Sequence, residues 1–293
     1  MQYVEAYRWG EEELSRAGIT ESKLDARLLL EHVCGTNRNT LLVHGDREVS
    51  EVDFQCYKEM IGRRRSRIPL QHITGVQEFM GLEFLVNEHV LIPRQDTECL
   101  VEEVMRFLQD GSRILDMCTG SGCILLSLLH YSNSCKGVGV DISEEALKVA
   151  HANGERIMAL PRPGVEPIAG DAGALRFIQS DLFSGVKEEK FEIIVSNPPY
   201  IASGVIPALM EEVKDHEPIL ALDGKEDGLF FYRKIVEAGR AHLVKEGRLF
   251  LEIGYDQAEA VSGLMEAAGF EEVTVVKDLA GLDRVVHGIY MEG

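Results

Sequence analysis

The hydrophobic pattern divides the chain into a helical N-terminal part and a longer part with a different periodicity. Up to Pro69, apolar residues recur at the spacing of an amphipathic helix, as at Leu24, Leu28, Leu29 and Val33 and again at Phe54, Tyr57, Met60 and Ile61. Short polar breaks separate the expected helices, and the proline stops the last of them. We therefore expect a small helical domain over residues 1–71.

Residues 72–95 have the pattern of a linker that contains a β-hairpin. Two short strand patterns cover 83–86 and 89–92, and Gly75 and Gly81 supply turns. We expect this segment to join the helical domain to the rest of the chain.

From residue 96 to residue 293, strand and helix patterns alternate. The expected strands are 113–117, 137–141, 176–180, 191–196, 248–253, 272–276 and 285–291. The expected helices are 122–131, 143–152, 228–245 and 256–268, with another that begins near residue 97. Alternation of this kind predicts an α/β domain with a parallel sheet and helices on both faces. No helix pattern joins the last two strands, so we expect them to pair antiparallel, which is more similar to the class I methyltransferase sheet than to a dehydrogenase sheet.

Residues 154–175 contain three prolines and four glycines without a period. We expect a surface loop there and assign it no function. No internal repeat is visible in the sequence.

The strand pattern 191–196 leads directly into Asn197-Pro198-Pro199-Tyr200. Proline has no N–H group, so this segment offers acceptors and almost no donors. The side-chain oxygen of Asn197 and the carbonyl of Pro198 are two acceptors on a stiff backbone, which suits a planar NH₂ group held by both hydrogens. A plain strand-ending turn is the alternative.

A glycine-rich turn follows the strand 113–117 and opens a helix. Glycine lets the backbone approach a ligand closely, and the start of a helix supplies free N–H groups. The turn lacks the spacing of a dinucleotide fingerprint, a serine nucleophile elbow or a P-loop. Its residues are Cys118, Thr119, Gly120, Ser121 and Gly122.

Acidic residues end the next two expected strands. Asp141 lies about 20 residues after the glycine turn, where a carboxylate can accept both hydroxyls of a ribose. Asp181 ends the third strand, where it could meet an adenine amino group. The alternative for Asp141 is an acid at the start of a helix, and the alternative for Asp181 is a turn residue. Because ligands bind at the carboxyl ends of parallel strands, these positions favour S-adenosylmethionine over NAD.

Charge and cysteine content restrict the class of protein. The net charge is −19, from 49 acidic and 30 basic residues, so a nucleic-acid substrate would need a local basic patch. The one dense basic run, 63–67, is expected to be a solvated helix face or a docking patch for an acidic partner. Six cysteines without ligand spacing predict reduced thiols and no metal site. With no signal peptide pattern and no apolar stretch long enough to span a membrane, we expect a soluble cytoplasmic protein.

With these motifs the chain resembles the HemK/PrmC family, the protein-(glutamine-N5) methyltransferases of class I peptide-chain release factors. The resemblance covers nearly the whole sequence. Two features differ from the family: Gln95 stands where proline is more common, and the segment 154–175 is longer than usual. It implies a class I, Rossmann-like methyltransferase domain with a seven-stranded sheet behind a helical N-terminal domain. The segments that carry it are 25–29, 69–75, 90–98, 114–122, 196–201 and 251–254.

The resemblance also implies residue roles. The S-adenosylmethionine contacts fall on 118–122, Asp141, Leu182 and Asn197. The glutamine-binding residues fall on Asn197, Pro198, Pro199 and Tyr200, and we assign catalysis to Asn197, Pro198 and Tyr200. The substrate would be the glutamine of a Gly-Gly-Gln motif in the release factor, read by the helical domain. The oligomeric state stays open, with a monomer as the expectation.

In the expected mechanism, Asn197 and the Pro198 carbonyl each accept one N–H of the glutamine amide. Tyr200 packs against that amide, or else is a core tyrosine. Glu252 is either part of the pocket wall or a salt-bridged structural acid. Asp96 is expected as the N-cap of the helix that begins near residue 97, and its segment, 93–98, is equally expected to shape the cofactor pocket.

Two other functions use the same features. An adenine-N6 or guanine-N2 nucleic-acid methyltransferase shares the Asn-Pro-Pro-Tyr loop and would act on an exocyclic amine. A non-catalytic binding module could have kept the fold. The charge argues against the first, and the intact loop and glycine turn argue against the second.

Overall fold

The computed structural model describes residues 1–161 and 174–292, which form two compact units. The smaller unit comprises Met1–Val76 and Met210–His216, and the larger one comprises Gln77–Leu209 and the chain from Glu217 onward. This division differs in two places from the boundaries expected from the sequence. The expected linker 72–95 belongs to the larger unit from Gln77 onward, and a short segment after the Asn-Pro-Pro-Tyr loop belongs to the smaller one.

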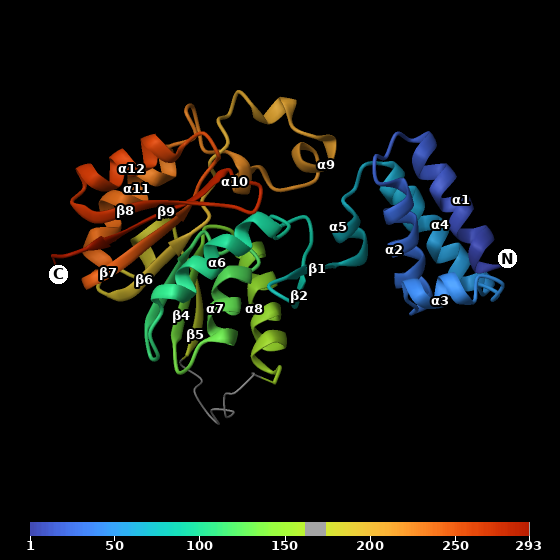
Figure 1. Ribbon diagram of the computed structural model, residues 1–293, viewed down its shortest axis with the longest axis horizontal. Helices are drawn as coiled ribbons and strands as arrows, with labels where there is room; N and C mark the ends of the chain where they lie inside the picture. Colours follow the sequence, from blue (N-terminus) through green and yellow to red (C-terminus); the bar gives the residue numbers. More distant parts are fainter. Residues whose placement is uncertain (162–173, 293) are drawn as a thin grey trace. The chain divides into compact units, whose positions relative to one another are not determined.

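The smaller unit is helical throughout (Figure 1). Its helices are α1 Tyr3–Arg16, α2 Ser22–Cys34, α3 Arg38–Val43, α4 Glu51–Arg65, α5 Leu70–Thr74 and α9 Glu211–Lys214. Tyr57 is fully buried at its centre and donates a hydrogen bond to the Ala26 carbonyl at 3.0 Å. Gly10 makes this packing possible, because a Cβ there would lie 2.0 Å from the tyrosine hydroxyl oxygen.

The basic run at the end of α4 forms ion pairs within this unit. The Arg64 Nε donates to Asp25 Oδ2 at 2.7 Å, and both its terminal nitrogens lie 3.2 Å from Glu212 Oε1. Arg65 pairs with Glu13, and Arg67 with Glu212. The interpretation of this run as a solvated face or docking patch is therefore wrong for Arg64, which is buried.

The buried face of α2 also differs from the expected one. Leu24 is 40% exposed, whereas Asp25, Ala26, Leu29 and Leu30 are buried. The helical period is confirmed, and Leu29 and Val33 of the expected face do pack in the core. Leu24 does not, and the buried Asp25 beside it pairs with Arg64.

The larger unit contains the seven-stranded sheet expected from the sequence. Its strands are β3 Arg113–Met117, β4 Lys136–Asp141, β5 Leu175–Gln179, β6 Phe191–Ser196, β7 Leu243–Glu252, β8 Phe270–Lys277 and β9 Asp283–Tyr290. Their order is β5-β4-β3-β6-β7-β9-β8, and β9 runs antiparallel to β7 and β8 while the other pairs are parallel. The predicted antiparallel end is thus confirmed. Strands β1 Val76–Phe79 and β2 Leu82–Leu85 form a separate two-stranded sheet. The expected strand 83–86 is therefore confirmed within one residue, but the expected strand 89–92 is wrong, because β2 pairs with the segment before it.

Helices cover both faces of this sheet (Figure 1). One face packs against α6 Gln95–Phe107, α7 Cys123–Tyr131 and α8 Glu144–Met158, and the other against α11 Phe230–Gly239 and α12 Ala258–Ala267. Alternate residues of β6 serve the two cores: Ile193 and Val195 face the first and Ile194 the second. This alternation accounts for the continuous apolar run in the sequence.

Several helix boundaries differ from the expected ones. Helix α11 ends at Gly239, short of the expected 245, because β7 already begins at Leu243. Helix α8 continues to Met158 into the segment expected as a loop, while 162–173 of that loop lie outside the described residues. Asp96 lies in the first turn of α6, and Arg94 occupies the N-cap position.

The remaining short elements are α10 Ile219–Leu222 and the 3₁₀ turns Leu182–Gly185, Ile206–Ala208 and Arg240–His242. In the part of the chain that the structure describes, no helix combines the length and apolar character needed to cross a membrane.

The ion pairs of Arg64 give a first test. Burial raises the pKa of Asp25 even though Arg64 opposes this, so the carboxylate depends on its partner. We expect Arg64→Met to lower the free energy of unfolding of the smaller unit by about 3 kcal/mol, because it leaves a buried charge uncompensated. Denaturant unfolding followed by Trp9 fluorescence measures this, since the single tryptophan packs against Phe54 and Tyr57 in the same core.

The matched control is Arg16→Met, which removes ion pairs of a largely exposed arginine with Glu12 and Glu13. Its expected loss is below about 1 kcal/mol. Equal losses in the two variants would contradict a structural role for the Arg64 cluster.

Candidate active site

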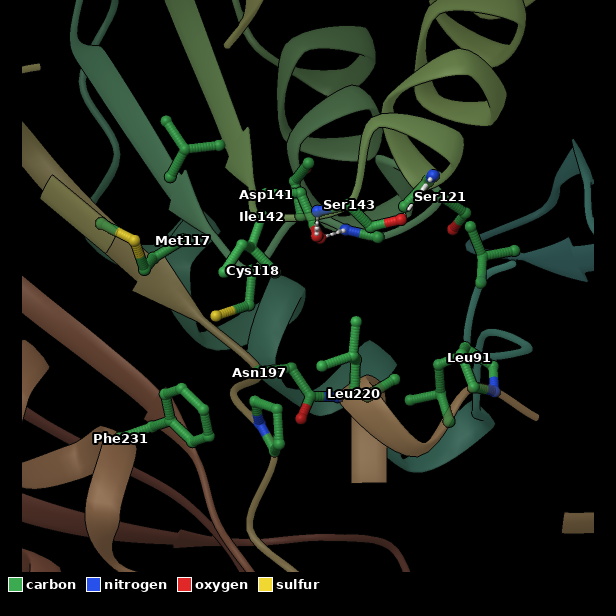
Figure 2. Close-up of a pocket in the computed structure, with 18 of the residues that line it drawn as sticks. Leu91, Met117, Cys118, Ser121, Asp141, Ile142, Ser143, Asn197, Leu220 and Phe231 are labelled. Carbon is green, nitrogen blue, oxygen red and sulfur yellow. Dashed lines mark hydrogen bonds between the residues drawn. The ribbon is translucent and has the colours of Figure 1, made fainter. Parts of the chain in front are cut away.

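A cavity of about 360 Å³ opens at the carboxyl ends of β3, β4 and β6 in the larger unit. Figure 2 shows Ser121, Asp141 and Ser143 on one side of it and Asn197 and Leu220 on the other. Of the residues predicted from the sequence, those in its wall are Cys118, Thr119, Gly120, Ser121, Asp141, Asp181, Leu182, Asn197 and Pro199. Strand pairing thus brings together segments that are up to about 80 residues apart.

The glycine turn adopts the strained backbone that its sequence allows. Cys118, Gly120 and Gly122 have φ values of 61°, 55° and 79°, in the left-handed region that favours glycine. Gly122 is the N-cap of α7. Behind the turn, the fully buried Asp116 accepts a 2.6 Å hydrogen bond from the Thr119 hydroxyl.

Asp141 links this turn to the start of α8. Its Oδ2 accepts from the Gly120 N–H and its Oδ1 from the Ser143 N–H, both at 2.9 Å. Burial raises the pKa of Asp141, and these backbone hydrogen bonds oppose the shift. Each carboxylate oxygen keeps further acceptor capacity toward the cavity, so a ribose-binding role and a helix-start role are compatible here.

Asp181 and Leu182 complete this side of the cavity. Asp181 is exposed and follows β5, and Leu182 has a φ of 49° where the 3₁₀ turn begins. The exposed carboxylate faces the cavity from the strand next to that of Asp141.

Asn197 lies at the end of β6, beside the glycine turn. Met117 and Ser196 are partners in the parallel pairing of β3 with β6, so the next residues, Cys118 and Asn197, both enter the cavity wall. The Asn197 Nδ2 donates to the Thr97 Oγ1 at 3.3 Å. Within the described chain, neither Asn197 Oδ1 nor the Pro198 carbonyl accepts a hydrogen bond.

The backbone of the loop is fixed from behind. Gln257 Nε2 donates to the Tyr200 carbonyl at 3.0 Å, and Gln257 Oε1 accepts from the Gly254 N–H at 2.9 Å. Gly224 and Gly228 pack directly on Tyr200, where an added Cβ would lie 2.7 Å and 2.4 Å from its backbone atoms. These contacts leave the loop little freedom to rearrange.

Tyr200 points away from the cavity. Its hydroxyl donates to Glu252 Oε1 at 3.4 Å, and its ring packs against the core that contains Tyr232. Among the described residues, Pro198 and Tyr200 are absent from the cavity wall. This arrangement agrees with the core-tyrosine alternative for the ring.

Glu252 lies behind the wall at the end of β7 and is 2% exposed. Burial raises its pKa to about 7, while Thr97, Arg284 and Tyr200 favour the ionised form. No ion pair within 4.0 Å is found for it in the described chain, so it is a buried acid supported by hydroxyl groups.

Several residues of the wall have no individual role predicted from the sequence. Thr97 lies in the segment expected both to begin a helix and to shape the cofactor pocket, whereas Leu220 and Phe231 lie in segments far from any motif. Arg94 donates to both oxygens of the buried Glu217, at 2.6 Å and 2.8 Å, which anchors the chain that leads to Leu220. Such pairs join distant segments and have no local pattern.

Comparisons with known proteins match both parts of the chain. Residues 5–75 match the family model described as the PrmC N-terminal domain, and residues 95–214 match the methyltransferase small domain. The release factor glutamine methyltransferase of Geobacter sulfurreducens is 37% identical over 96% of this chain and 94% of its own length. The protein of the same name from Clostridium acetobutylicum is 40% identical over 89% of each chain.

A solved structure agrees in fold. The crystal structure of a methyltransferase from Pyrococcus furiosus has a TM-score of 0.52 and 19% identity, and it covers 79% of this chain and all of that one. Together with the strand order, this confirms the Rossmann-like methyltransferase fold of the larger unit.

Asp116 gives a test of the site's electrostatics. Burial raises its pKa from 3.8 to about 7 against the opposing hydrogen bonds of Thr119 and Leu125. The folded state therefore binds more protons than the unfolded state between about pH 4 and pH 7, so Asp116 makes the free energy of unfolding fall as the pH rises through this window. In Asp116→Asn, we expect the free energy of unfolding to decrease by about 2–4 kcal/mol less over this pH range than in the wild type.

Urea unfolding at pH 5 and pH 8 measures the difference, with the exposed Glu144→Gln as the control. The control should follow the wild type. If the free energy of unfolding of Asp116→Asn fell as steeply with pH as that of the wild type, a raised pKa of Asp116 would be contradicted.

Proposed function

The chain belongs to the release factor glutamine methyltransferase family, and from this we propose that it methylates N5 of the glutamine in the Gly-Gly-Gln motif of class I peptide-chain release factors, with S-adenosylmethionine as the methyl donor. The observation that carries the proposal is the Asn197 side chain, whose nitrogen is bound by Thr97 while its oxygen has no partner in the described chain. An acceptor fixed in this way at the cavity suits a primary amide.

The cavity fits the methyl donor at its glycine side. The turn at 118–121 passes along the wall without a side chain at Gly120, and nothing lies within 4 Å of a Cβ built there. Gly122 is not part of the wall and packs against Leu126 and Phe177. We propose that Asp141 binds the ribose hydroxyls, that Asp181 and Leu182 contact the adenine, and that Asn197 borders the reacting end. When bound, S-adenosylmethionine supplies an electrophilic methyl group on its sulfonium.

The substrate nitrogen is a weak nucleophile because its lone pair is delocalised into the amide carbonyl. In the proposed mechanism, Asn197 Oδ1 and the Pro198 carbonyl each accept one N–H of the glutamine side chain. These two acceptors direct the nitrogen lone pair toward the methyl donor and stabilise the positive charge that develops on the N–H groups. Positioning of this kind can supply about 7–11 kcal/mol of the barrier reduction.

Pro199 forms the wall beside this amide. We assign to Tyr200 the support of the loop through Glu252 and the backbone, in place of direct stacking on the substrate. The stiff Pro-Pro backbone and its anchors then keep the two acceptors at a constant separation.

We propose that the helical domain, residues 1–71, recognises the release factor and that the hairpin segment 72–95 joins it to the methyltransferase domain, residues 96–293. In the basic run 63–67, which kept a nucleic-acid substrate open, Arg64, Arg65 and Arg67 form ion pairs with Asp25, Glu13 and Glu212. With a net charge of −19, a protein substrate is favoured over a phosphate backbone. A monomer acting on release factors in the cytoplasm follows from this proposal.

The proposal is tested by methyl transfer from labelled S-adenosylmethionine to a purified release factor, beside its Gly-Gly-Gln→Gly-Gly-Ala variant. We expect label on the intact factor alone. Equal label on both would place the acceptor elsewhere in the factor, and label on nucleic acid in its place would overturn the protein substrate.

We expect Asn197→Ala to lower turnover by about 100-fold, the effect typical of removing one preorganised polar group from a reacting centre. The affinity for S-adenosylmethionine, measured by calorimetric titration, should change much less. Asn133→Ala, an exposed asparagine in the turn before β4, is the matched control. Unchanged turnover in the Asn197 variant would remove this residue from the mechanism.

A further inference from the structure

We propose that Thr97 and Glu252 act as positioning residues that fix the orientation of the Asn197 side-chain amide, so that its oxygen and not its nitrogen faces the substrate. The consequence for catalysis rests on the proposed function, but the orientation itself does not. Both residues lie outside the motif that carries Asn197: Thr97 is in the first turn of α6 and Glu252 ends β7.

An asparagine amide fits a site in two orientations that exchange its oxygen and nitrogen. One orientation offers an acceptor to the cavity and the other offers donors. A glutamine NH₂ group needs acceptors, so only the first is productive. The site must therefore contain a group that distinguishes the two.

Thr97 is in contact with Asn197 but cannot make this choice alone. Its side chain is 3% exposed, and its Oγ1 lies 3.3 Å from Asn197 Nδ2. A hydroxyl group can accept from an amide nitrogen or donate to an amide oxygen. Which of these it does depends on where its own hydrogen is directed.

Glu252 supplies the direction. An ionised carboxylate only accepts hydrogen bonds, and Thr97 stabilises this form of Glu252. Oε1 accepts from the Tyr200 hydroxyl at 3.4 Å, while Oε2 is buried and accepts no hydrogen bond in the described chain. We assign the hydrogen of Thr97 to this vacant acceptor. With its hydrogen directed to this carboxylate, the Thr97 oxygen can only accept, and the Asn197 nitrogen must turn toward it.

The groups around Glu252 shift its pKa in opposite directions. Burial raises its pKa to about 7, and the Arg284 cation opposes this shift, while Asp96 adds to it. Protonated Glu252 could donate to Thr97, whose hydrogen would then be free to reach Asn197 Oδ1 and reverse the amide. The titratable and charged groups that face Glu252 are Asp96 and Cys99 of α6, Cys123 of α7, Tyr200, Tyr232 of α11 and Arg284 of β9.

The first experiment compares Thr97→Val with Thr97→Ser. Valine keeps the shape and removes the hydroxyl, so we expect kcat to fall about tenfold, on the scale of one lost hydrogen bond, with little change in S-adenosylmethionine affinity. Serine should restore most of the activity. The matched control, Thr274→Val on the exposed strand β8, should leave kcat unchanged.

A double-mutant cycle separates positioning from a general structural role. In the Asn197→Ala background, Thr97→Val should cause no further loss, because the amide that it orients is absent. A full additional loss there, or wild-type activity of the single Thr97→Val variant, would overturn the proposal.

Glu252→Gln tests the direction of the hydrogen bond. Glutamine can donate to Thr97 at every pH, so we expect a lower kcat without the decline that the wild type shows as the pH falls through the pKa of Glu252. A variant that keeps the wild-type kcat and the same acid limb would overturn the role of Glu252.

A measurement without substrate keeps this proposal separate from the proposed function. In ¹⁵N-labelled protein, the side-chain NH₂ signals of Asn197 are identified by their loss in Asn197→Ala. They should shift and exchange faster with solvent in Thr97→Val and not in Thr97→Ser. If no release factor is methylated, the proposed function fails while these signals still test the orientation, and signals unchanged in Thr97→Val overturn it.

Discussion

The parallel pairing of β3 with β6 places Met117 beside Ser196, and the active site depends on this register. Because both strands end at the same edge of the sheet, the glycine turn and the Asn-Pro-Pro-Tyr loop begin next to each other. A shift of one residue would reverse the faces of every side chain on β6 and place core residues such as Ile194 against the wrong helices. The packing of two apolar cores on opposite faces therefore holds the register that the chemistry needs.

At this edge of the sheet, hydrogen bonds more than ion pairs hold the polar side chains in place. Asp141 is bound by two backbone N–H groups, and Asn197 is bound by Thr97. The acids of the site that lie deepest, Asp116 and Glu252, have raised pKa values because water is excluded from them. In each acid one oxygen accepts from a hydroxyl group, while Asp116 Oδ1 and Glu252 Oε2 are buried without a hydrogen-bond partner in the described chain. At Asn197, by contrast, the cavity presents an uncharged acceptor.

The helical unit also contains buried charged groups, and there they have a structural role. Arg64 satisfies Asp25 on α2 and Glu212 on α9, so that a segment following the Asn-Pro-Pro-Tyr loop is part of this unit. A buried cluster of this kind adds specificity more than stability, because each charge is removed from water at a considerable energetic cost. It also accounts for Arg64 within the dense basic run, while Arg63 and Arg65 of the same run are exposed.

The sequence by itself determined the order of strands and helices, the antiparallel end of the sheet and the positions of the glycine turn, Asp141 and Asn197. These features have local causes: alternation of apolar residues, the freedom of glycine and the missing N–H of proline act over a few residues. Only the tertiary structure decided that Tyr200 turns away from the cavity, that Arg64 is buried, and that Thr97 and Glu252 lie behind Asn197. Those outcomes depend on contacts between residues up to about 150 positions apart, where geometry and the removal of water, not local pattern, set the partner of each polar group.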